Sequence, residues 1–73
     1  MKINFDVMDA TGIPEMVKSH YGRVLNFIEH GVGGGNPNFT AEFSDREHAV
    51  AFMTELYGGE CLDFDMYIVK EGR

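Results

Sequence analysis

A glycine-rich segment divides this chain of 73 residues into two parts of similar length. Residues 31–37 read Gly-Val-Gly-Gly-Gly-Asn-Pro, with four glycines among the first five positions. Glycine and proline at this density interrupt regular structure, so we predict a loop here. A chain of this length has room for one hydrophobic core only. The two parts must therefore fold together as a single domain over residues 1–73.

The first part begins with a strand. Residues 2–8 alternate in polarity, with Ile3, Phe5 and Val7 on one face. This two-residue period is typical of a strand with one buried face. Pro14 follows after a short break and suits the first turn of a helix, where its missing N–H would have no partner.

Residues 14–30 allow two interpretations. Apolar side chains at three- and four-residue spacings predict one amphipathic helix that ends at Gly31. Against this, Gly22 would cost about 1 kcal/mol inside a helix. Residues 24–28, Val-Leu-Asn-Phe-Ile, are also rich in strand-forming types. We favour a short helix followed by a strand and keep the single helix as the alternative.

The second part predicts a strand, a helix and a last strand. Residues 39–43 alternate like the first strand. Ser44 and Glu47 form a capping box at the start of the helix, and Gly58 follows its end. The last strand runs from about residue 62 to residue 70, with carboxylates and apolar side chains in alternation.

This order of elements predicts an α+β fold of the ferredoxin-like βαββαβ type. It has a four-stranded antiparallel sheet in the order 4-1-3-2, with two helices on one face. The alternative is a three-stranded βαβαβ sheet with one long first helix. In both arrangements one face of the sheet remains free of helices.

Charge and composition restrict the function. The formal net charge is −6, and residues 37–73 contain three basic and eight acidic residues. Contact with a phosphate backbone needs clustered Lys and Arg, so we expect no direct nucleic-acid binding and favour a basic partner. A lone cysteine, Cys61, forms no internal disulfide, which fits the cytoplasm. No apolar run approaches the roughly 18–20 residues of a membrane helix, so we expect no membrane partner.

The acidic residues provide the main candidate surface. In the ferredoxin-like arrangement the first and last strands are neighbours, so Asp6, Asp63 and Asp65 share the helix-free face, with Glu42 on the next strand. Facing like charges repel each other. The face is then either a solvated surface or a carboxylate array for a basic partner. A calcium or magnesium site is a further alternative, but a flat sheet lacks the wrapping loop of such sites.

The glycine loop and the histidines do not indicate a catalytic or metal-binding site. The glycine loop has no phosphate-binding pattern and no Lys or Arg, and we interpret it as a connector that can adapt to a partner. The three histidines have no metal-ligand spacing, and no nucleophile with a base is recognisable. We therefore predict no enzyme activity, no metal and no cofactor.

These observations predict a small acidic regulator or inhibitor that docks on a basic surface of another macromolecule, such as one that normally holds nucleic acid. The alternatives are a homodimeric domain that binds a small ligand and a divalent-cation protein. Small acidic accessory proteins, including those of bacteriophages, share this composition, but no segment carries a family signature. The predicted contact residues are Asp6, Glu42, Asp63, Asp65, Tyr67, Gly33, Gly34, Gly35 and Asn36.

Overall fold

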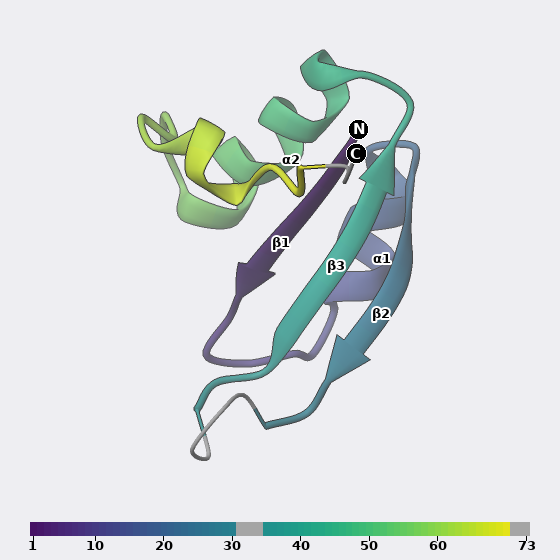
Figure 1. Cartoon of the computed structure of the whole chain (residues 1–73), viewed down its shortest axis with the longest axis vertical. Helices are drawn as coiled ribbons and strands as arrows, with labels where there is room; N and C mark the ends of the chain where they lie inside the picture. The colour runs from purple at the N-terminus through teal and green to yellow at the C-terminus, as the bar shows by residue number, and fades with distance from the viewer. Residues whose placement is uncertain (31–34, 71–73) are drawn as a thin grey trace.

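The computed structural model describes residues 1–30 and 35–70, which adopt an α+β fold. Its three strands form one antiparallel sheet in the order β1-β3-β2. Both helices pack on the same face of the sheet, and Figure 1 shows α1 behind the strands. The elements are β1 (Lys2–Asp6), α1 (Ile13–Ser19), β2 (Gly22–Ile28), β3 (Asn38–Phe43), α2 (Arg46–Tyr57) and the 3-10 helix η1 (Phe64–Tyr67).

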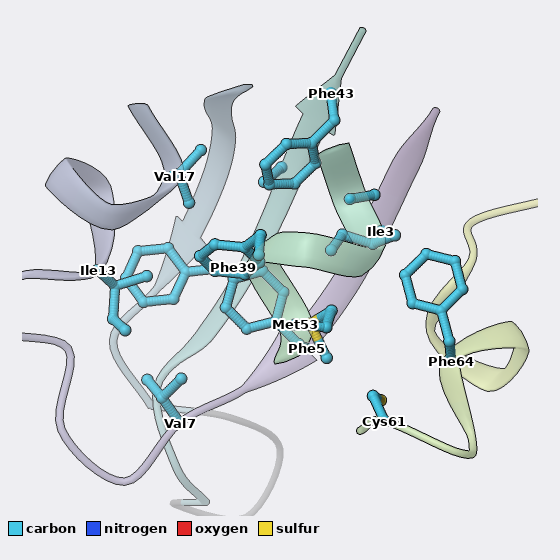
Figure 2. Close-up of a cluster of buried hydrophobic side chains, with 13 residues drawn as sticks. Ile3, Phe5, Val7, Ile13, Val17, Phe39, Phe43, Met53, Cys61 and Phe64 are labelled. Atoms are coloured by element: carbon cyan, nitrogen blue, oxygen red, sulfur yellow. The ribbon is translucent and has the colours of Figure 1, made fainter. Parts of the chain in front are cut away.

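The core lies between the sheet and the helices. The central strand β3 pairs with β1 so that Phe39 lies opposite Phe5 and both side chains point to the helix side. From α2, the Phe52 ring packs 5.1 Å from the Phe5 ring and 5.2 Å from the Phe43 ring, measured between centroids. Val17 of α1 is fully buried beside them, and Figure 2 shows this cluster. The predicted apolar faces of the first and third strands are confirmed.

The prediction of a short first helix followed by a strand is also confirmed, and the single helix over residues 14–30 is wrong. The N–H of His20 donates to the carbonyl of Val17, and Tyr21 then adopts a left-handed φ of 64°. β2 begins at Gly22. This position requires glycine because its backbone lies too close to the Phe43 side chain to leave room for a Cβ atom. A Cβ atom at Gly22 would lie 2.5 Å from the Phe43 ring and 2.9 Å from the Glu42 carbonyl oxygen.

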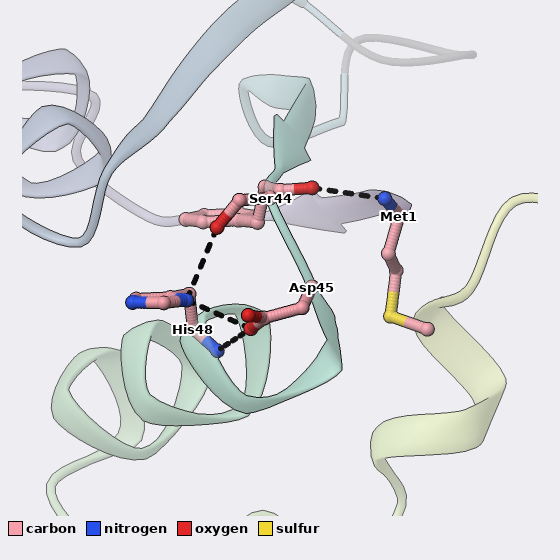
Figure 3. Close-up of polar contacts among 5 residues, drawn as sticks. Met1, Ser44, Asp45 and His48 are labelled. Carbon is pink, nitrogen blue, oxygen red and sulfur yellow. Dashed lines mark hydrogen bonds and ion pairs between the residues drawn. The ribbon is translucent and has the colours of Figure 1, made fainter.

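The capping of α2 differs from the prediction. The cap is Asp45 and not Ser44, because the carboxylate of Asp45 accepts the backbone N–H of His48 at 2.9 Å. The Ser44 hydroxyl instead contacts the imidazole Nδ1 of His48 at 3.1 Å, as Figure 3 shows. Ser and Asp are both good N-caps, so the sequence alone did not separate them. The helix ends at Gly58 in a left-handed conformation, as expected.

The predicted fourth strand is wrong. Residues 64–67 form η1, with the N–H of Met66 donating to the Asp63 carbonyl. Phe64 is buried, whereas Leu62 and Met66, which the alternation placed on the same face, are 83% and 81% exposed. Burial in this segment therefore does not follow the two-residue alternation. Among the described residues after η1, Ile68 forms an isolated bridge opposite Ile3 of β1, and the N–H of Val69 donates to the Lys2 carbonyl.

Candidate functional site

The helix-free face of the sheet carries a network of amide and hydroxyl groups. Alternation along β1 and β3 turns Asn4, Asp6, Asn38 and Thr40 to this face, opposite to the buried aromatic side chains. Asn4 donates through Nδ2 to Asn38 Oδ1 at 2.8 Å and to Thr40 Oγ1 at 2.9 Å. Asn38 donates back to Asn4 at 3.1 Å and to Asp6 Oδ1 at 2.5 Å. The network holds the Asp6 carboxylate in place from one side.

A hollow of about 630 Å³ adjoins this network at the end of the sheet near the glycine loop. Three predicted contact residues, Asp6, Gly35 and Asn36, line it, whereas the predicted Gly33 and Gly34 lie outside the described residues. None of its described lining residues is Lys or Arg. The full set is Asn4, Asp6, Ile28, His30, Gly35, Asn36 and Asn38.

A second hollow, of about 410 Å³, lies beside the first residues after β1. Its walls are mainly apolar, and Asp6 and Asp9 are its carboxylates. Met8 is 90% exposed at this position. The Asp9 carboxylate accepts the backbone N–H of Thr11 at 2.9 Å, and this hydrogen bond lowers the pKa of Asp9. The lining residues are Asp6, Val7, Met8, Asp9, Ile13, Leu56 and Tyr57.

Asp6 is the residue that the two hollows share. A carboxylate with one oxygen held by Asn38 can still accept hydrogen bonds from a cationic side chain, and Arg does so in a bidentate manner. The apolar walls of the second hollow suit the aliphatic part of a long basic side chain, which packs along apolar surface while its charge stays in water. This end of the sheet therefore combines carboxylates with apolar surface.

Glu42 lies on the open face as predicted but is locally compensated. Arg23 of β2 lies opposite Glu42 and donates to its Oε1 through Nη2 at 2.9 Å and through Nε at 3.1 Å. Hydrogen bonding from Arg23 lowers the pKa of the Glu42 carboxyl. The pair reduces the negative charge that this part of the face offers to a partner.

The C-terminal residues of the predicted site do not reach the open face. Asp65 pairs with Arg46 of α2 at 2.8 Å, and the Arg46 guanidinium carbon lies 5.0 Å above the Phe64 ring. The Tyr67 hydroxyl accepts a hydrogen bond from Tyr57, whose pKa is raised by burial and by this contact. The prediction that four carboxylates share one face is therefore wrong. Asp6 and Glu42 share it, whereas Asp63 and Asp65 remain exposed beside α2.

The described residues contain neither a metal-ligand cluster nor a membrane-spanning helix. Within residues 1–30 and 35–70, no three His, Cys, Asp or Glu side chains are grouped so that they could hold a metal ion. Among the same residues, no helix has the length and apolar character needed to cross a bilayer.

Comparisons with protein-family models, with curated proteins and with solved structures found no match to this chain. The proposed function therefore rests on the geometry of the described residues.

The amide network was not predicted from the sequence. The positions of Asn4, Asn38 and Thr40 follow from the same alternation that placed Asp6 and Glu42 on the open face. These three residues are uncharged, so a prediction based on charge did not include them. His30 had no comparable signal, because its place at the hollow depends on how β2 pairs with β3.

Proposed function

We propose that this protein is a small binding protein, a regulator or inhibitor, that docks through the Asp6 end of its sheet on a basic segment of another macromolecule. The observation that carries the proposal is that Asp6 lines both hollows while no Lys or Arg is among their described lining residues. A basic side chain of the partner would meet uncompensated negative charge there.

The second support is the exposed apolar surface next to these carboxylates. Met8 and Tyr57 line the second hollow and are partly exposed to solvent. Met8 is one of the most exposed apolar side chains among the described residues. Methionine adapts its shape to different partners and is common at binding surfaces. A partner segment with alternating basic and apolar side chains fits this combination better than a nucleic acid, whose phosphates the acidic residues repel.

The fold supports the proposal in a more general way. We propose that the chain is a ferredoxin-like domain with a reduced fourth strand. The order β1-β3-β2 and the Ile68 bridge at the outer edge of β1 support this proposal, because the fourth strand of the order 4-1-3-2 would lie at that edge. Domains of this topology that bind single-stranded RNA place aromatic side chains on the open face, whereas here that face has amides and carboxylates.

The test is a titration of the isotope-labelled protein with two synthetic peptides, an oligoarginine and a peptide of alternating Arg and Leu. Backbone amide signals of residues 6–9 are expected to shift, and the Arg-Leu peptide should bind more tightly because its leucines also contact apolar surface. Asp6→Asn should weaken binding several-fold. The association rate should fall as salt is added, since charge steers the encounter.

Asp63→Asn is the matched control, because it removes the same charge from an exposed position outside both hollows. Asp63→Asn is expected to change the affinity by less than about twofold, because salt largely screens a charge that lies away from the contact surface. If Asp63→Asn weakens binding as much as Asp6→Asn does, the interaction depends on net charge alone. The proposed surface would then be refuted.

A further inference from the structure

We propose that the outer edge of β2 pairs with β2 of a second copy of this chain, which joins two sheets into one six-stranded sheet. The proposal concerns the opposite side of the sheet from β1 and does not depend on the docking function. It rests on which backbone groups of β2 are free, on how they are spaced, and on the apolar side chains beside them.

The two edges of the sheet differ. The outer edge of β1 is occupied, because Ile68 bridges Ile3 and the N–H of Val69 donates to the Lys2 carbonyl at 2.9 Å. β2 pairs with β3 on one side only among the described residues. A strand edge with unpaired N–H and C=O groups is a template for another strand. The edge strand β2 also has three side chains at 40–47% exposure, those of Leu25, Phe27 and Ile28.

The hydrogen bonds between β1 and β3 identify the free groups of β2. The N–H of Phe43 donates to the Met1 carbonyl and the N–H of Val7 donates to the Pro37 carbonyl, so odd-numbered residues of β3 face β1. The even-numbered residues of β3 therefore face β2, where their partners are Arg23, Asn26 and Ile28. The backbone groups of Val24 and Phe27 consequently point away from β3.

Val24 and Phe27 are three residues apart because a β-bulge lies between Val24 and Asn26, whereas Gly22, opposite Phe43, lies two residues before Val24. A regular strand presents backbone groups to one side at every second residue, so a regular peptide does not match this edge. A second copy of β2, running antiparallel, presents the same spacing in reverse order. Val24 then lies opposite Phe27 of the other copy, and Phe27 lies opposite its Val24.

In this register the side chains of the two copies also pack favourably against each other. Val24 and Phe27 both point to the helix side of the sheet, where Val24 lies opposite the buried Ala41 and the Phe27 ring stacks 4.7 Å from the ring of Phe39. Pairing places a β-branched side chain next to an aromatic one twice, a favourable combination across strands. The twofold axis passes beside Leu25, which brings the two copies of this exposed side chain close together.

The first test is the mass of the full chain in solution, measured by sedimentation from low to high micromolar concentration. The expected mass at high concentration is twice the monomer mass of 8.2 kDa. Leu25→Lys should return the protein to the monomer mass, since two lysines would repel each other at the axis. Leu62→Lys is the matched control, because Leu62 is 83% exposed in the segment that leads to η1 and should leave the dimer intact.

The second test is hydrogen exchange of individual backbone amides in the unmodified protein, which needs no variant. Exchange at Val24 and Phe27 should slow several-fold as the protein concentration rises, whereas exchange at Arg23 and Ile28, which face β3, should not. A monomer mass at every concentration, an unchanged mass for Leu25→Lys in a folded sample, or concentration-independent exchange at Val24 and Phe27 would each overturn the proposal.

The effect of salt concentration on binding distinguishes this self-association from the docking function. Each copy has a net charge of −6, so salt should strengthen self-association by screening the repulsion. It should weaken binding to the basic peptides. Loss of one behaviour with retention of the other shows which proposal has failed.

Discussion

Replacing Gly22 by alanine should strongly destabilise the fold, although Gly22 has an ordinary negative φ and lies at the start of an edge strand. The added Cβ would lie 2.5 and 2.6 Å from two atoms of the Phe43 ring and 2.9 Å from the Glu42 carbonyl oxygen. The ring cannot move aside easily because Phe43 is 2% exposed and packs against Phe52. The carbonyl oxygen belongs to the central strand, so its displacement would disturb the sheet.

Overpacking of a tight core typically costs 1–3 kcal/mol, and we expect about 2 kcal/mol here. For a domain of this size, a loss of about 2 kcal/mol lowers Tm by roughly 10 °C. Thermal unfolding followed by circular dichroism measures this shift. Gly59→Ala is the matched control, since a Cβ there meets nothing within 4 Å, and it should be neutral or slightly stabilising.

A second variant locates the cause of the Gly22 effect. In a Phe43→Leu background the smaller side chain can move away from the new methyl group, so Gly22→Ala should cost less than it does in the unmodified protein. The reasoning fails if Gly22→Ala melts at the same temperature as Gly59→Ala. It also fails if the cost is unchanged in the Phe43→Leu background, because the ring would then not be the obstacle.

Two further predictions concern the C-terminal half. Phe64→Ala should cost about 3–5 kcal/mol by leaving a cavity, and a melt like that of the unmodified protein would contradict the burial of this ring. Asp45→Ala should lower Tm more than Ser44→Ala, because Asp45 accepts the His48 N–H; equal effects would contradict this cap. The same hydrogen bond lowers the pKa of Asp45, so the stability it provides is present above the ordinary carboxyl value of 3.8 and is lost as pH falls through the lowered pKa. An acid titration of Tm should therefore show a smaller loss in Asp45→Ala.

The sequence predicted those elements whose periodicity agrees with their packing. The alternation of Ile3 and Phe5 in β1 and of Phe39 and Phe43 in β3 matches their burial, because one face of each strand meets the helices. The strand-forming residues 24–28 outweighed the helical spacing of the same stretch, as expected from the cost of glycine in a helix.

The prediction from the sequence failed where contacts with another part of the chain decide the conformation of a short segment. Residues 62–68 alternate in polarity, but burial of Cys61 and Phe64 and the ion pair between Arg46 and Asp65 favour a 3-10 turn against α2. None of these contacts is local, so no pattern within the segment reports them. The predicted carboxylate array depended on this strand and changed with it.

The sequence by itself determined the charge of the chain and the inward faces of β1 and β3, because these faces follow from a period of two residues along each strand. The tertiary structure alone decided which carboxylates keep uncompensated charge. Asp6 is held by Asn38 and Glu42 is paired with Arg23, and both partners come from other strands. Electrostatic compensation depends on distance in space, and the register of the sheet sets that distance.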